Sequence, residues 1–334
     1  YEACEQLRRL RGQDWAQLFE TPYGRWLAGL MRREALLVPS IEGDLDLAEA
    51  PGLPAAAELW RAILQDNPEC LPQLSMLGRV GRQLVGLLDR TVDASSLVSE
   101  LHHSPIAEAI HHADPSYAGV RMALEAMLVR AASDWPASRR LRVLEISAGP
   151  SDLPHVLLNA LPQDRFDYVL AVADPVLQAR QGSEFQAHAN IAVTGFDPLA
   201  LNVVLPTQSP QSFDVLVLRH SLHRSIDPQA ALARLRTLLT IDGTLWLAER
   251  HADWSIDFVE GLDPQWWHEG QDAEPQSALQ TPQTWQHLLQ GAGFDAVTLF
   301  LEPQAQGLSA GAYLLLGRSP ASSKLESPPE ATQA

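Results

Sequence analysis

The sequence predicts a doubly wound α/β fold, a mostly parallel seven-stranded sheet with an antiparallel last strand, attached to a helical N-terminal subdomain. Up to about residue 137, apolar residues recur at helical spacing; from Leu141 short apolar runs alternate with helical segments. This alternation is typical of a parallel sheet covered by helices. The last two strand candidates are joined by residues 303–311, PQAQGLSAG, which contain no helical pattern. A connection of this kind requires antiparallel pairing.

The N-terminal region is predicted to contain helices only. The clearest helical patterns are PAAAELWRAILQDNP, LPQLSMLGRVGRQLVGLLDR and YAGVRMALEAMLVRAASDW, separated by linkers that contain Pro, Asp and Ser. We therefore expect a helical subdomain over 1–137 and an α/β core over 138–318. The Ser/Pro-rich stretch 319–334 predicts a flexible tail or interdomain linker. Together with Tyr1 in place of an initiator methionine, it indicates a piece cut from a longer chain.

The predicted strands of the core are LRVLEI, FDYVLAVAD, NIAVTGF, FDVLVLR, GTLWLAE, FDAVTLFLE and AYLLLGR. Helical segments such as HVLLNALP, PQAALARLRTLLT and PQTWQHLLQGAG lie between most of them.

The composition of the chain limits the binding partners and the cellular compartment that we expect. The chain has 334 residues, is 46% hydrophobic and carries a formal net charge of -17, from 24 basic and 41 acidic residues. Phosphate backbones are bound by clustered Lys and Arg, so nucleic acid and anionic membranes are not expected as partners. The two cysteines, Cys4 and Cys70, give neither a disulfide framework nor metal-ligand spacing, which favours a reducing, cytoplasmic setting.

Two local clusters of arginine interrupt the acidic chain. They are Arg8, Arg9 and Arg11, and Arg139, Arg140 and Arg142. We interpret both as solvated helix and strand ends, with docking of an acidic protein partner as the alternative.

Carboxylates follow three successive strands of the core. Glu145, Asp174 and Asp197 stand at or just after the first, second and third strands. Ligands of such sheets bind outside the carboxyl ends of the strands, so this spacing predicts a nucleoside ligand. Each Asp taken alone is equally typical of a helix N-cap.

The first loop differs from the dinucleotide fingerprint G-x-G-x-x-G. Its three positions are occupied by Ser147, Gly149 and Asp152, and Asp152 places a negative charge where a pyrophosphate would bind. An NAD-dependent enzyme is therefore not expected.

Several segments resemble S-adenosylmethionine (SAM)-dependent methyltransferases, and in particular the C-methyltransferase domains of modular polyketide synthases. They are RVLEISAG, VADPVLQARQGSEF, SFDVLVLRHSLHRSIDP, LRTLLTIDGTLWLAE, GLDPQWW and TWQHLLQGAGF, while LWRAILQDNPE and DPSYAG resemble the lid subdomain of that family. The resemblance covers nearly the whole chain and implies a Rossmann-like class I methyltransferase fold with a helical lid.

The resemblance implies methyl transfer from SAM to the α-carbon of a β-ketoacyl thioester held on an acyl carrier protein, next to neighbouring polyketide synthase domains. His223 would remove the α-proton and Glu249 would orient the imidazole. The implied cofactor-binding residues are Glu145, Ser147, Gly149, Asp174, Asp197 and Arg219, and the implied substrate-side residues are Tyr117, Trp266 and Trp267.

The cofactor loop departs from the E-I-G-A-G-T-G-G pattern of that family. Ser147, Pro150, Ser151 and Asp152 replace its small residues, and Arg219 and His220 stand where the family has a small residue and Asn. Glycines let a backbone approach its ligand without a Cβ in the way. These changes leave a second hypothesis open, a catalytically inactive pseudo-methyltransferase with a scaffolding role.

No metal site is predicted. The pairs His102–His103 and His111–His112 have metal-ligand residue types, but residues 102 and 111 fall on opposite faces of a helix and Pro105 intervenes.

Overall fold

The computed structural model describes residues 7, 19–39, 45–47, 56–197, 202–203, 211–269, 274–302, 304–305 and 308–320. The chain divides into two compact units. The first, here called the helical unit, consists of Tyr1–Ala118 and His251–Gln280; the second, the sheet unit, consists of Gly119–Arg250 and Thr281–Ala334.

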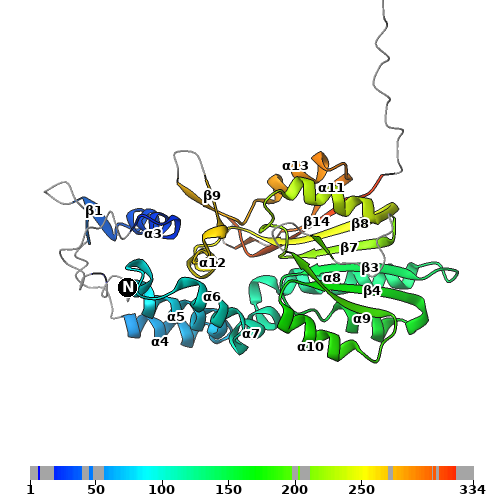
Figure 1. Ribbon diagram of the computed structural model, residues 1–334, viewed down its shortest axis with the longest axis horizontal. Helices are drawn as coiled ribbons and strands as arrows, with labels where there is room; N and C mark the ends of the chain where they lie inside the picture. The colour runs from blue at the N-terminus through cyan, green and yellow to red at the C-terminus, as the bar shows by residue number, and fades with distance from the viewer. Residues whose placement is uncertain are drawn as a thin grey trace, which may run out of the picture. The chain divides into compact units, whose positions relative to one another are not determined.

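The helical unit is assembled from two separate stretches of the chain (Figure 1). Its first stretch contains α3 (Pro22–Arg33), β1 (Leu37–Pro39), β2 (Leu45–Leu47), α4 (Ala56–Asp66), η2 (Pro68–Cys70), α5 (Leu71–Leu88), α6 (Ala94–His102), α7 (Pro105–Ala113) and the start of α8 (Pro115–Asp134). Its second stretch contains α12 (Trp254–Glu260), η4 (Pro264–Trp266), β9 (Trp267–Glu269) and β10 (Pro275–Ser277).

Local sequence signals explain where these helices begin. Thr21 caps α3 by accepting the backbone N–H of Gly24, and Pro22 occupies the first helical turn, where its missing N–H costs nothing. One core of the unit packs Trp26 of α3, Val80 and Leu84 of α5, and Val259 of α12. The second stretch therefore completes the core of the first.

The expectation of helices alone before residue 137 was wrong at one place. β1 and β2 form an antiparallel hairpin, in which Leu37 pairs with Leu47. Each strand is only three residues long, so its alternation is too short to be recognised in the sequence.

The sheet unit confirms the predicted fold class. Its strands lie in the order β11-β14-β8-β7-β3-β4-β5-β6, where β14 is antiparallel to both neighbours and β3, β4, β5, β7 and β8 are parallel. The strands are β3 (Leu141–Ser147), β4 (Phe166–Val172), β5 (Ile191–Asp197), β6 (Asn202–Val203), β7 (Phe213–Arg219), β8 (Leu239–Arg250), β11 (Asp295–Leu301) and β14 (Ala312–Arg318), with a small hairpin of β12 (Gln304–Ala305) and β13 (Leu308–Ser309).

Helices cover both faces of this sheet. In Figure 1, α11 (Pro228–Leu238) and α13 (Pro282–Gly291) lie on one face, and α9 (Leu153–Ala160) and α10 (Pro175–Phe185) lie on the other; η3 (Gln163–Arg165) leads into β4. Because both faces are covered, β7 is buried along its entire length. Strand order reverses between β3 and β7, and this switch point is where such folds bind their ligands.

The division into units differs from the boundaries expected from the sequence. Residues 119–137 group with the sheet, and residues 251–280 group with the helices although they follow β8. Of the other sequence expectations, Cys4, Arg8, Arg9, Arg11 and residues 321–334 of the tail lie outside the described residues. Among the helices of the described part of the chain, none is both long and apolar enough to cross a lipid bilayer.

Candidate functional site

The switch point places the end of β7 beside the end of β3. Ser147 of β3 is the register partner of Arg219 of β7, and the Ala148 N–H donates to the Arg219 carbonyl at 3.0 Å. The loop that follows β3 is thereby tied to β7 before α9 begins at Leu153. Side chains from both strands converge at this loop.

Glu145 is the centre of a buried polar network in the loop. Its side chain is fully buried, and Arg219 Nη1 donates to its Oε1 at 2.8 Å. Its other oxygen, Oε2, accepts from Ser151 Oγ and from the Tyr168 hydroxyl, each at 2.6 Å. Both carboxylate oxygens are therefore engaged by side chains of the protein itself.

The same network fixes the backbone of the loop. Ser151 Oγ also accepts from Arg219 Nη1 at 3.0 Å and from the Leu153 N–H at 3.2 Å. Gln181 of α10 donates to the Ser151 carbonyl at 3.1 Å, and the Gly149 N–H donates to Ser147 Oγ at 3.3 Å. Contacts from β3, β7 and α10 thus hold the loop in one conformation.

Burial keeps Tyr168 neutral. Its pKa is raised well above the usual value, first by burial and then by the charge of Glu145. A neutral hydroxyl remains a hydrogen-bond donor to Glu145. The net charge of the Glu145–Arg219 pair is zero, which is the form in which two charges tolerate burial.

His223 and Glu249 form the dyad that the sequence predicts. His223 Nδ1 lies 2.9 Å from Glu249 Oε2, while Glu249 Oε1 accepts the Leu222 N–H at 3.1 Å. Glu249 is 1% exposed and His223 is 9% exposed. His220, whose backbone adopts a left-handed conformation with φ 49°, has Nδ1 3.9 Å from Glu249 Oε2. The arrangement holds an imidazole in one orientation with its Nε2 edge turned away from the carboxylate.

The two aspartates expected to bind a nucleoside lie at the same edge of the sheet. Asp174 follows β4, which is next to β3 in the strand order, and Asp197 ends β5, which is next to β4. Asp174 Oδ1 accepts the N–H groups of Val176 and Leu177, so this residue caps α10. Asp197 is exposed. These contacts support the N-cap interpretation of Asp174, while ribose binding by Asp174 and adenine binding by Asp197 stay predictions.

The tryptophans expected beside the substrate lie in the helical unit. Trp266 is 2% exposed, and its indole N–H donates to Asp257 Oδ1 at 2.8 Å. The Trp267 N–H donates to the Gly261 carbonyl at 2.7 Å, and its ring centroid is 5.4 Å from that of Trp26. Tyr117 is 5% exposed in the same unit. All three are packed into the unit, and their contact with a substrate stays a prediction.

The basic cluster at 139–142 is engaged within the sheet unit. Arg139 and Arg142 both bond Asp214, and Arg140 pairs with Asp167 at 2.8 Å. These pairs support the structural interpretation of the cluster.

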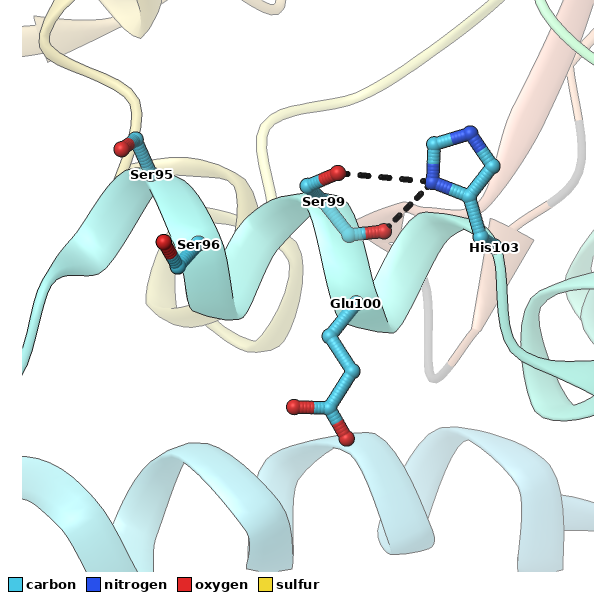
Figure 2. Close-up of a pocket in the computed structure, with 5 residues that line it drawn as sticks. All are labelled: Ser95, Ser96, Ser99, Glu100 and His103. Atoms are coloured by element: carbon cyan, nitrogen blue, oxygen red, sulfur yellow. Dashed lines mark hydrogen bonds between the residues drawn. The ribbon is translucent and has the colours of Figure 1, made fainter.

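A separate pocket of about 590 Å³ lies along α6 (Figure 2). It is lined by Ser95, Ser96, Ser99, Glu100 and His103, and His103 Nδ1 contacts the Ser99 carbonyl at 2.7 Å and the Ser99 hydroxyl at 3.5 Å. Its lining comes from one exposed helix face and contains none of the residues predicted from the sequence.

The structure also brings in residues that the sequence did not indicate as site residues. Tyr168 lies within an apolar strand and Gln181 within a helix, and only their buried polar groups, which need partners, distinguish them. Ser151 was recognised as a departure from the family pattern, but its bonds to Glu145 and Arg219 follow from the fold.

The methionine end of SAM does not fit this loop. SAM carries an ammonium, a carboxylate and a sulfonium cation, and Glu145 is the carboxylate at the loop that would meet the cationic groups. Both of its oxygens already accept hydrogen bonds from side chains of this chain, and the Arg219 guanidinium that it pairs with would repel a cationic group brought to the same carboxylate. Asp152, in contrast, is exposed, so its charge is screened by water. The internal network, rather than Asp152, is what a cationic ligand group at Glu145 would have to displace.

Comparisons with known proteins agree with this architecture. A family model described as "Methyltransferase domain" matches residues 118–299, more than half of the chain. The non-reducing polyketide synthase dpfgA of Gibberella zeae is 25% identical over 254 residues, which are 73% of this chain and 12% of that protein. The chain thus spans about an eighth of the length of this relative.

Solved structures show the same fold. The CMeT domain of the citrinin polyketide synthase has a TM-score of 0.74 at 18% identity, covering 90% of this chain and 78% of that one. The trans-methyltransferase CalH, solved in complex with SAH, has a TM-score of 0.67 at 21% identity, covering 95% of this chain and 87% of that one. On the strength of its family match, the chain belongs to the methyltransferase domain family.

Proposed function

We propose that this chain is a C-methyltransferase-type domain of a polyketide synthase that receives β-ketoacyl chains from an acyl carrier protein but does not methylate them. The observation that carries the proposal is the Arg219 guanidinium, held by Glu145 and Ser151 at the switch point. The polyketide synthase setting is supported by the relatives and by the solved C-methyltransferase domains that share the fold.

The Arg219–Glu145 ion pair is buried, which makes it costly to separate. Arg219 has 8% of its side-chain surface exposed and Glu145 has none. Separating a buried ion pair costs about 3–5 kcal/mol when one charge is left without a partner. That penalty lowers the affinity of a ligand that must displace Arg219 roughly 100-fold or more. SAM can recover part of this free-energy cost only if its own ammonium binds Glu145 in place of Arg219.

The direct test is isothermal titration of the domain with SAM and with its demethylated product. We expect no saturable heat from either ligand and no rise in melting temperature, because ligand binding to the folded state must stabilise it. Saturable binding together with a gain of one methyl group's mass on a β-ketoacyl carrier protein would overturn the proposal.

The second candidate is active C-methylation of the same substrate, and the assembled dyad is the observation that favours it. His223 and Glu249 have the contact that α-proton removal requires. Mass spectrometry of several β-ketoacyl carrier proteins incubated with SAM decides between the two candidates. A methyl gain that disappears in His223→Ala supports methylation, whereas no gain with any chain supports the non-methylating domain.

A further inference from the structure

Helix α8 has apolar residues on its exposed side as well as on its buried side. On the buried side, Val120, Leu124 and Leu128 are almost completely enclosed. The exposed side has small or apolar residues at alternating steps of three and four, here called the α8 stripe: Gly119, Met122, Ala126, Val129 and Ser133. Met122 is 65% exposed and Val129 is 38% exposed. A helix that is apolar on two sides is usually covered on both, so a partner surface is expected over the stripe.

The spacing of the α8 stripe is that of a two-stranded coiled coil. In a heptad written abcdefg, Met122 and Val129 take position d, while Gly119, Ala126 and Ser133 take position a. In a parallel pair of helices, each of these positions packs against the same position of the other helix. Small residues at position a let the two backbones approach closely, and the d residues then supply the buried apolar area.

Charges of opposite sign flank the α8 stripe. In the same heptad, Glu125 takes position g and Arg130 takes position e. A residue at g of one parallel helix lies beside the e residue five positions further along the other helix. Glu125 would therefore face the partner's Arg130, and two-fold symmetry would form this contact twice.

The present partners of these two residues do not prevent the exchange. Glu125 lies 4.0 Å from Arg121 and Arg130 lies 2.6 Å from Asp134, each one turn away on α8 and partly exposed. Exposed pairs of this kind contribute little free energy, so their loss on association is small.

The charges also distinguish parallel from antiparallel pairing. In an antiparallel pair centred on the same stripe, Glu125 and Arg130 would face alanines, Ala132 and Ala123. Such a pair would gain no interhelical ion pair.

We propose that the α8 stripe binds the α8 stripe of a second copy of this chain, as a parallel, two-fold symmetric pair of helices. A second copy is the occupant because the surface is complementary to itself in both spacing and charge. The stripe covers about two heptads, which is less than the roughly 800 Å² per partner of a standard interface, so the dimer is weak and concentration-dependent. The net charge of -17 opposes association, but at 0.15 M salt this repulsion is screened beyond about 8 Å.

Sedimentation velocity tests the proposal on the whole chain, at salt of about 0.15 M and from about 1 μM to about 1 mM protein. We expect the mass to rise from that of a monomer towards that of a dimer. Glu125→Arg alone and Arg130→Glu alone bring like charges together and should each weaken association at least about tenfold. The double variant exchanges the two charges and should associate like the wild type.

A matched pair of substitutions tests the apolar part of the contact. Val129→Lys places a charge in the stripe and should abolish association. Val176→Lys makes the same change at a valine of α10 that is 65% exposed and outside the stripe, and it should associate like the wild type. Circular dichroism and melting curves establish that each variant is folded, and recovery in the double charge variant is a second, internal control.

A cysteine at position 133 tests the orientation. In a parallel pair, Ser133→Cys brings two thiols together at position a, and oxidation by copper–phenanthroline should yield a covalent dimer above the level that Cys4 and Cys70 give in the wild type. In an antiparallel pair, Ser133 would face Met122 and no such dimer would form.

A chain that stays monomeric at the highest concentration overturns the proposal, and so does association that neither Val129→Lys nor the single charge variants weaken. Dimerisation without the cross-link at position 133 overturns the parallel arrangement. None of these measurements involves SAM, so the result is independent of the proposed function.

Discussion

Arg219 Nη1 donates to both Glu145 Oε1 and Ser151 Oγ, at 2.8 and 3.0 Å. One guanidinium nitrogen therefore links a carboxylate near the end of β3 to a serine in the loop that precedes α9. The loop between these two elements is held by a side chain from β7, so its conformation depends on a residue distant in sequence. The first two predictions concern this link.

Replacing Arg219 should open the cofactor loop. Arg219→Ala removes the cation beside the sulfonium position and frees Glu145 for the cofactor's ammonium. We expect saturable SAM binding to appear, with an affinity at least about tenfold above the detection limit set by the wild type, which corresponds to roughly 1.4 kcal/mol. Adding Ser151→Gly and Asp152→Gly should raise it further by removing side chains from the loop. Isothermal titration measures both steps.

Two controls make the result specific. Asp152→Gly alone should change the affinity little, because Asp152 is exposed and its charge is screened. Arg318→Ala removes an arginine that pairs with Asp295 at the far edge of the sheet and should have no effect. Unchanged affinity in the triple variant would show that the pocket is closed elsewhere.

The same substitution should destabilise the domain when no ligand is present. Arg219→Ala leaves Glu145 buried without its counterion, and we expect a loss of about 3–5 kcal/mol in the free energy of unfolding. Combining Arg219→Met with Glu145→Gln should recover most of this loss. The carboxamide has no charge and still accepts from Ser151 and Tyr168. Urea denaturation of the two single variants and the double variant measures the coupling; additive effects would contradict it.

Ser225 should lower the stability of the fold. Ser225→Ala removes a buried hydroxyl that has no partner among the described residues, so we expect unchanged or higher stability, by up to about 1 kcal/mol, in urea denaturation. Ser221→Ala is the matched control, since the Ser221 hydroxyl is buried but donates to the Ile146 carbonyl at 3.3 Å. That variant should lose stability. A Ser225→Ala domain that is destabilised like Ser221→Ala would contradict the assignment.

The sequence was sufficient for most of the sheet. Its predicted strands were recognisable because short runs rich in apolar residues alternate with helical segments, and β4, for example, contains the uninterrupted apolar run Tyr168–Val172. The pairing of His223 with Glu249 came from the family resemblance; His223 lies just after β7, and Glu249 lies near the end of the neighbouring strand β8. The hairpin of β1 and β2 and the partners of Glu145 did not follow, because each depends on contacts between distant segments that no local pattern encodes.

The role of Asp152 likewise depends on its exposure, which no local sequence pattern encodes. A carboxylate at the start of a helix beside a cofactor loop suggested electrostatic exclusion, but exposure decides how strongly such a charge acts. The buried ion-pair partner at this loop is Glu145, which pairs with Arg219.

Asp257 should make the stability of the helical unit depend on pH. It accepts from the Trp266 indole and the Ser277 hydroxyl at Oδ1, and burial raises its pKa above the usual 3.8 although these two bonds lower it. The folded state therefore favours the protonated acid. Its contribution to stability is complete below the unfolded pKa of 3.8 and is lost as pH rises through the raised folded pKa.

Asp257→Asn tests this dependence. The amide stays neutral and keeps an acceptor oxygen, so the variant should gain stability relative to wild type as pH rises from about 3 to about 7 in urea denaturation. Asp257→Ala leaves the Trp266 and Ser277 donors unpaired and should cost about 1–3 kcal/mol for each. A constant difference between wild type and Asp257→Asn across this range would contradict the prediction.

The two chain stretches of the helical unit restrict how such a domain is exchanged between longer proteins. Residues 251–280 follow β8, yet Val259 and Leu262 belong to the same core as Met76 and Val80. A chain cut after Ala118 would keep residues 251–280 without the apolar partners that cover them. Recombination that replaces only the N-terminal helices must therefore preserve a matching surface more than a hundred residues downstream. Successful gene exchange is expected to carry both stretches together, with breakpoints outside residues 1–280.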